Sequence, residues 1–214
     1  MCAVHHLQAH TLDLRARRAN LGCGHDCPNL WGAPFMLARL FRKKSIKRAA
    51  RSLYDYLSAV AREPALYGPG RVADSPDGRF ELLALFASVF FTRLSKRGEQ
   101  ADETAQEVFD ILFSGMDHAL RELGVGDISV GKRIRKLAES FYGRMAVYHD
   151  CIARSGEEPA ALSQAIGRHV LEQADGDHPF AAILAQRTLD WAALLEQQSD
   201  ADLLSGQIAG PLRV

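Results

Sequence analysis

The chain has no long uninterrupted hydrophobic run, which argues against a membrane-spanning helix. Such a helix needs about 20 mostly apolar residues. The most apolar stretch, Phe80–Phe91, is interrupted by Glu81 and is followed by Arg93 and Lys96. We therefore interpret it as a helix buried in a protein core. The N-terminus also lacks a basic region followed by a compact apolar run, so we expect no secretory signal peptide.

The chain also lacks an excess of charge of either sign. Its 26 lysines and arginines balance its 26 aspartates and glutamates, for a formal net charge of +0. A protein drawn to a polyanion by its overall field would carry a clear surplus of positive charge. We therefore expect no DNA partner, and any attraction to RNA or lipid has to come from local clusters.

Cysteines are few and unevenly placed, with three in the first 27 residues and Cys151 alone in the remainder. A secreted disulfide scaffold would spread them through the fold, so a reducing compartment fits better. Cys23, His25 and Cys27 could supply metal ligands, but a structural zinc site wants a second, distant pair. His149 and Cys151 are two residues apart on an expected helix and do not face each other. We therefore predict no metal, cofactor or catalytic residue.

Apolar residues recur with helical spacing, and no segment alternates as a strand would. This pattern predicts an all-α fold, a single compact domain of about six helices over residues 39–198. The expected helices cover residues 45–63, 79–96, 102–124, 127–155, 158–174 and 180–198. Expected N-caps are Ser45, Asp102, and Asp127 or Ser129, while Gly124 suits a C′ position with positive φ. On the third helix we expect these residues to face inward: Val108, Ile111, Leu112, Met116, Leu120 and Leu123.

The two ends of the chain differ from this body. Residues 1–38 contain glycine and proline breakers without helical periodicity, and Met36 opens a more regular segment. They are expected to be a flexible N-terminal extension or to come from a misassigned start, with a mitochondrial targeting segment as the rival interpretation. Residues 199–214 are expected to form a loose C-terminal tail.

Two dense basic segments are candidate binding surfaces. The first carries seven positive charges and no acid, and could meet RNA phosphate or anionic lipid headgroups. The second opens the helix after Asp127, where positive charge is disfavoured by the helix dipole, which suggests a partner for it. The alternative for both is simple exposure to solvent. The first segment comprises Arg39, Arg42, Lys43, Lys44, Lys47, Arg48 and Arg51, and the second Lys132, Arg133, Arg135 and Lys136.

Three stretches of the chain resemble the ubiquinol–cytochrome c chaperone family. They read SLYDYLSAVAREPALY (52–67), ADSPDGRFELLALFASVFFTRL (73–94) and QEVFDILFSGMDHALRELGVGDISVGKRIRKLAESFYGRMAVY (106–148). The similarity extends over about residues 45–190. Members often show Leu-His where this chain has Leu85 and Phe86, so a polar role at that position is in doubt.

The resemblance implies a helical, non-enzymatic assembly chaperone for the cytochrome bc1 complex. It implies that the client is newly made cytochrome b, that mitochondrial members pair with a small helical co-chaperone, and that they act near the ribosome. For a bacterial member we expect the cytoplasm, peripheral at the inner membrane; the alternative is the matrix side of the mitochondrial inner membrane.

A chaperone of this kind needs one surface for an amphipathic client helix, in a groove between helices, and another for RNA or lipid. Candidates for partner contact are Asp117, Arg121, Glu122 and Asp127, although Asp127 could simply cap a helix. Two rival functions remain: a ribosome- or RNA-associated binding module using Arg39 to Arg51, and an enzyme with a metal or Cys/His site.

Overall fold

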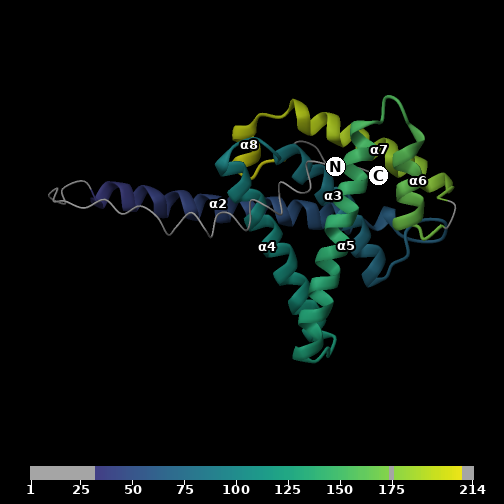
Figure 1. Ribbon diagram of the computed structural model, residues 1–214, viewed down its shortest axis with the longest axis horizontal. Helices are drawn as coiled ribbons and strands as arrows, with labels where there is room; N and C mark the ends of the chain where they lie inside the picture. Colours follow the sequence, from purple (N-terminus) through teal and green to yellow (C-terminus); the bar gives the residue numbers. More distant parts are fainter. Residues whose placement is uncertain (1–31, 174–175, 209–214) are drawn as a thin grey trace. The chain divides into compact units, whose positions relative to one another are not determined.

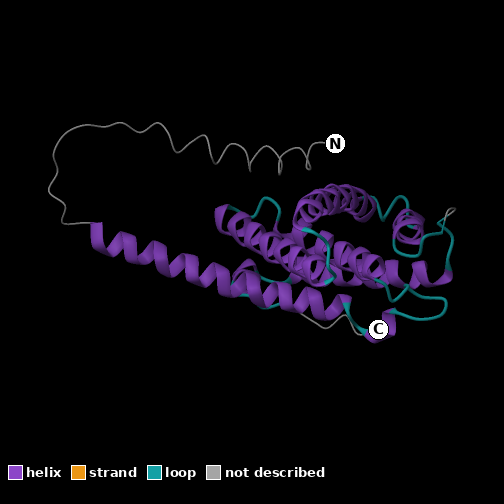
Figure 2. Ribbon diagram, turned by 90° about the horizontal axis from the view of Figure 1, so that it is seen from below, coloured by secondary structure: helices purple, strands orange, loops and turns teal. Residues whose placement is uncertain are grey.

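The computed structural model of the protein describes residues 32–173 and 176–208, and most of these residues are helical (Figure 1). In Figure 2 the described segments are helices joined by loops, with no strand among them; a single isolated bridge pairs Tyr67 with Val72. The expected all-α fold is thus confirmed, and among the described residues the structure adds the short helix α8 and the 3-10 helix η2 to the six expected helices. The elements are α2 (Gly32–Ala61), the 3-10 helix η2 (Pro64–Leu66), α3 (Pro76–Leu94), α4 (Glu99–Glu122), α5 (Asp127–Ala153), α6 (Ala160–His169), α7 (Pro179–Gln197) and α8 (Asp200–Leu204).

The chain divides into two units between Arg42 and Lys43, and the helices of the core pack together within the second unit. Helix α2 begins at Gly32, so residues 32–38, which the sequence predicts as part of a flexible extension, are helical. The candidate metal ligands Cys23, His25 and Cys27 lie outside the described residues.

Helix α2 contributes one apolar face to the core. Ile46, Ala49, Ala50 and Val60 are buried on this face, and Leu53 and Leu57 are fully buried. The expected N-cap at Ser45 is wrong because the helix begins at Gly32, so Ser45 lies inside it. Its last residue is Ala61, close to the end that Pro64 predicts.

Helix α3 lies at the centre of the core, in contact with α4, α5 and α7. Leu82, Leu85 and Phe90 have no exposed surface. The helix begins at Pro76, three residues before the expected Arg79, because Ser75 caps it by accepting a hydrogen bond from the Gly78 N–H (3.0 Å). Proline suits the first helical position, where no N–H is needed. Pro76 therefore starts the helix instead of extending the loop before it.

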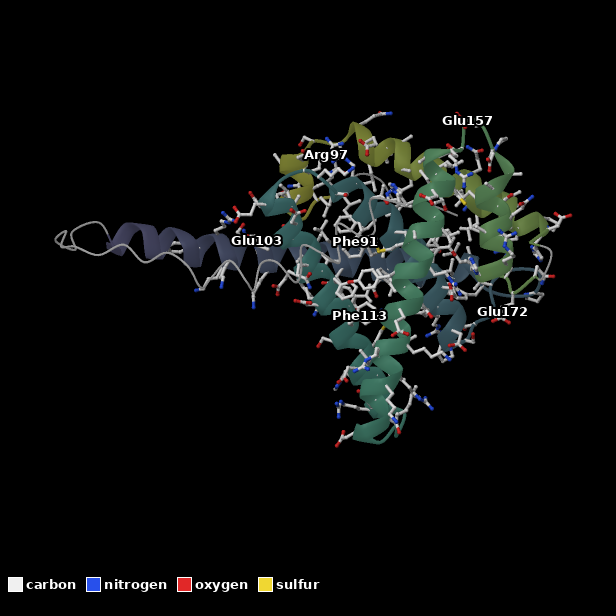
Figure 3. The ribbon with its side chains drawn as sticks, viewed as in Figure 1. Phe91, Arg97, Glu103, Phe113, Glu157 and Glu172 are labelled. Atoms are coloured by element: carbon white, nitrogen blue, oxygen red, sulfur yellow. The ribbon has the colours of Figure 1, made fainter. Side chains whose placement is uncertain are left out.

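Helices α4 and α5 form an antiparallel hairpin whose inner half packs on α3. Aromatic rings fill this junction: Phe141 of α5 meets Phe91, Phe109 and Phe113 edge to face at centroid distances of 5.7–6.0 Å. Phe91 and Phe113 are labelled there in Figure 3. Helix α4 starts at Glu99, after Gly98 with φ +98°, so the expected cap at Asp102 is wrong.

The C-terminal part is more ordered than its polar composition suggests. Helix α6 ends at His169, earlier than the expected residue 174, and Glu172 has φ +55° in the turn that follows. Ser199 then caps α8 by accepting from the Asp202 N–H, and Leu203 is fully buried. The expected loose tail from residue 199 is therefore wrong at its beginning.

Candidate partner-binding surfaces on the α4–α5 hairpin and on α2

The turn between α4 and α5 is built by its glycines. Gly124 has φ +79°, as expected for a C′ residue. Its N–H bonds to the Arg121 carbonyl (2.9 Å), and the Val125 N–H bonds to the Leu120 carbonyl (3.1 Å). These two bonds make a Schellman motif, which closes the end of α4. The chain can then reverse at once, so both helix ends meet at one tip.

Arg121 joins two of the predicted partner residues across this turn. Its guanidinium pairs with Asp117 one turn earlier (Nε to Oδ2, 2.7 Å) and with Asp127 at the start of α5. The hydrogen bond to Asp117 is the main reason that the pKa of Arg121 is raised. Asp127 does not cap α5, and neither does Ser129: Gly126 holds the N-cap position, and no side chain caps the helix. The Asp127 carboxylate is engaged by Arg121 and still lies in the first turn, where the helix dipole favours a negative charge.

Glu122 does not join this triad. It pairs with His118 (Nε2 to Oε1, 3.3 Å), and both side chains are well exposed. The structure therefore places the predicted partner residues of α4 in two neighbouring ion pairs at the hairpin tip. All of them remain accessible to another molecule.

The second basic segment lies on α5, just after the tip. Lys132, Arg133 and Arg135 are followed by Lys136, and none of the four side chains is buried. Within the described parts of the chain none of the four is paired with an acid. These cations are thus separate from the Arg121 triad, although they are close to it in sequence.

The first basic segment is divided by the structure. Lys47 pairs with Glu107 of α4 (3.8 Å) and Arg51 with Asp55 (3.0 Å). Lys43, Lys44 and Arg48 are exposed, and no acid among the described residues pairs with them. Arg39 and Arg42 belong to the first unit, and the side chain of Arg39 is not among those that the structure describes.

Lys47 and the second basic segment meet the hairpin at different levels. Lys47 contacts α4 at Glu107, whereas the tip follows Glu122. Fifteen residues of α-helix span roughly 22 Å. Because α5 returns from the tip beside α4, Lys132 and Lys136 lie roughly 13 and 7 Å from the level of Glu107 along the hairpin axis.

Apolar side chains become more exposed toward the tip. Val108 and Leu112 are buried, Met116 and Leu120 are partly exposed, and Leu123 is 71% exposed. The expectation that Leu123 faces inward is wrong. Figure 3 shows the reason: past Phe113 the hairpin leaves the other helices, and no other described helix covers it.

Sequence reasoning missed a polar cluster between α3, α5 and α6. Glu81 receives two hydrogen bonds from Arg144 (2.8 and 3.0 Å), and both side chains are largely buried. Beside them, burial raises the pKa of the Tyr148 phenol far above its ordinary value, and its hydroxyl lacks a partner among the described residues. His169 contacts the Tyr148 ring edge-on (6.3 Å). The one available signal was Glu81 itself, an acid inside an apolar run.

Cys151 and His149, the other reactive side chains considered in the sequence, lie in separate surroundings. Burial raises the pKa of the Cys151 thiol, while His149 Nδ1 lies 3.3 Å from the Thr92 hydroxyl. In the described ranges no three His, Cys, Asp or Glu side chains gather as metal ligands. Phe86 is buried, edge-on to Trp191 (6.1 Å), in an apolar setting.

An open cleft of about 360 Å³ lies before α3, lined by Arg62, Pro64, Tyr67, Asp74 and Arg79. Asp74 holds Arg79 at 2.7 Å, and burial raises the pKa of Tyr67. This polar lining does not suit an apolar client helix. No described helix is both long enough and apolar enough to cross a membrane.

Comparison with known proteins agrees with the resemblance seen in the sequence. The family model described as ubiquinol-cytochrome C chaperone matches residues 70–210. The crystal structure of the Cbp3 homolog from Brucella abortus is similar to this chain, with 33% sequence identity and a TM-score of 0.69. That match covers 80% of this chain and 94% of the other. Among curated proteins, none matches significantly.

Proposed function

The chain belongs to the ubiquinol–cytochrome c chaperone family, and from this premise we propose that it binds newly made cytochrome b and promotes assembly of the bc1 complex. The family match over residues 70–210 carries the proposal. We further propose that it acts without catalysis, at the cytoplasmic face of a bacterial inner membrane, and that a small helical co-chaperone can pair with it.

The outer half of the α4–α5 hairpin is our proposed client surface. Here the two helices pack mainly on each other, and several apolar side chains stay at least partly exposed: Met116, Leu120, Leu123, Ile134 and Leu137. An amphipathic client helix laid along this seam would cover them and complete a three-helix arrangement. Met116 adds an adaptable contact, since methionine fits irregular surfaces. The Arg121 triad lies beside the seam, where it can fix the orientation of a charged client segment.

Deletion of the gene tests the function as a whole. We expect the deletion strain to lose cytochrome b protein and bc1 absorbance while its cytochrome b transcript persists. Complementation with the full chain should restore both. Normal bc1 spectra in the deletion strain would remove the proposal.

Two matched arginine variants test the client surface. Arg121→Gln breaks the triad, whereas Arg154→Gln breaks a similarly exposed i,i+4 pair with Glu158 at the far end of α5. Exposed pairs contribute little to stability, so both variants should fold normally by circular dichroism. We expect capture of cytochrome b from solubilised membranes to fall several-fold for Arg121→Gln only. Equal capture by both variants would place the client elsewhere.

A ribosome- or RNA-associated function is the second candidate, favoured by the exposed cations Lys43, Lys44 and Arg48 on α2. It predicts co-sedimentation with ribosomes that weakens steeply as salt is raised. Co-sedimentation that is absent or insensitive to salt would exclude it.

A further inference from the structure

We propose that the tip of the α4–α5 hairpin docks on an anionic lipid surface. Leu123 enters the headgroup region, and four cations of α5 bind the lipid phosphates: Lys132, Arg133, Arg135 and Lys136. The biological setting of this docking rests on the proposed chaperone function: the hairpin tip is the part by which the chaperone reaches the membrane. Binding to pure lipid needs no client, so the two proposals can fail independently.

The charge around the tip suits a lipid surface. Residues 128–138 contain these four cations and no acid. Lys132 and Lys136 lie six and ten residues beyond Gly126, or roughly 9 and 15 Å along the axis of α5. Long side chains reaching toward the tip bring their ammonium groups within about one Debye length of a surface that the tip touches. Acids of the described chain do not pair with these cations, so their charge is available to a partner.

The acids at the tip are partly compensated, because Asp117 and Asp127 share the single positive charge of Arg121. Their repulsion of an anionic surface is therefore reduced where it would otherwise oppose the cations. The same arrangement leaves α5, not α4, to present the positive face.

Leu123 distinguishes lipid from nucleic acid as the occupant. It is 71% exposed at the end of α4, and the turn after it contains Gly124 and Gly126, which have no side chains to shield it. An aliphatic side chain gains free energy in the interfacial region of a bilayer but gains little beside phosphates in water. RNA surfaces combine cations with aromatic rings for base stacking, and residues 121–137 contain none. An exposed leucine followed by the four cations of α5 therefore fits a lipid surface better than a nucleic acid.

Vesicle sedimentation of the full-length protein tests this surface. The vesicles contain either phosphatidylcholine alone or phosphatidylcholine mixed with phosphatidylglycerol. We expect binding only to the mixed vesicles, weakening with salt. Each cation near an anionic membrane strengthens binding about fivefold, so the double variant Lys132→Gln, Lys136→Gln should bind about 25-fold more weakly. Leu123→Ser should bind about tenfold more weakly, and this loss should persist at high salt.

Matched controls separate the tip from general effects of charge and hydrophobicity. Lys43→Gln with Lys44→Gln removes the same net charge from α2, and Ile183→Ser removes a half-exposed apolar residue from α7. Neither control should change vesicle binding by more than about twofold. Loss of binding in the α2 control with none in the α5 variant would overturn the proposal, as would equal binding to both kinds of vesicle.

Nucleic acid is the remaining outcome to distinguish. The same variants are titrated with single-stranded RNA of comparable charge. Tight RNA binding that needs the α5 cations, together with vesicle binding that is indifferent to Leu123→Ser, would make the tip a nucleic-acid surface and refute lipid docking. Loss of vesicle binding in the double α5 variant with unchanged cytochrome b capture would support lipid docking and leave the client surface in place, since neither lysine belongs to the proposed client seam.

Discussion

Arg93 is the residue by which the core holds the C-terminal helix, and its replacement gives a sharp test of the fold. Its side chain is only 4% exposed. Nε donates to the Leu195 carbonyl, and Nη2 donates to the Gln198 carbonyl and to Asp200, each at 2.7 Å. One charged group of α3 therefore satisfies carbonyls at the end of α7 and anchors the start of α8.

The expected loss of stability for Arg93→Met follows from these contacts. Methionine retains much of the aliphatic stem, so the cavity term is small. The Leu195 carbonyl loses its hydrogen bond from the charged guanidinium and keeps only the one from the Gln198 N–H (3.2 Å), a loss of about 1.5–3 kcal/mol. Gln198 and Asp200 are partly exposed, so water recovers part of their loss. Together these losses should lower the free energy of unfolding by about 3 kcal/mol, which is at the low end of the range for breaking a buried ion pair.

Urea denaturation of Arg93→Met and Arg97→Met provides the measurement. Arg97 contacts the same acids, Glu196 at 2.9 Å and Asp200 at 4.0 Å, but its side chain is 39% exposed. Exposed pairs of this kind contribute at most about 1 kcal/mol. Hydrogen exchange in residues 200–206 should also accelerate in the Arg93 variant alone. If both variants lose the same small stability, the buried guanidinium does not hold α8 and the reasoning is refuted.

Two further predictions concern α6. Burial, with smaller effects from Arg144 and Arg168, lowers the pKa of His169 below its ordinary 6.5. The unfolded chain therefore binds a proton more readily than the folded chain does. The contribution of neutral His169 to stability is full above about pH 6.5 and falls as the pH drops below it. Urea titrations at neutral and mildly acidic pH should show a smaller decline in stability for His169→Gln. Gly167→Ala would place a Cβ 2.1 Å from the Gly176 carbonyl oxygen and should lower the free energy of unfolding by more than about 2 kcal/mol. The control Gly131→Ala adds a Cβ in open space on α5 and should be neutral or stabilising. Thermal melts of both variants measure the difference.

The helical class and the inward faces could be predicted because burial imprints a periodicity on the sequence. The apolar face of α2 is buried as its spacing predicts, and α3, a strongly apolar helix, lies in the centre. The i,i+4 pairs Asp117–Arg121 and His118–Glu122 were also predictable, since both partners lie on one helix.

Helix boundaries and long-range polar contacts were less predictable because each depends on a partner distant in sequence or on competing local geometry. Ser75 and Pro76 look like loop residues until the capping bond to Gly78 is seen. The C-terminal segment looks loose until Arg93 is found more than a hundred residues earlier in the chain, bound to Asp200. The pairing of Glu81 with Arg144 required knowing that α3 and α5 are neighbours.

Leu123 shows how a failed prediction can mark a functional surface. The helical spacing places it with Val108 and Leu112, and that spacing is real: the same face of α4 passes from fully buried to partly exposed and then to open surroundings as the hairpin leaves the core. An apolar residue that continues a buried face beyond the last helix able to cover it gains nothing from folding of the isolated chain. Its expected free-energy gain comes from something outside the chain, whether a client helix along the seam or lipid at the tip. Testing Leu123→Ser in both assays separates these: weaker binding to client-free vesicles assigns the gain to lipid, whereas weaker cytochrome b capture with unchanged vesicle binding assigns it to the client seam.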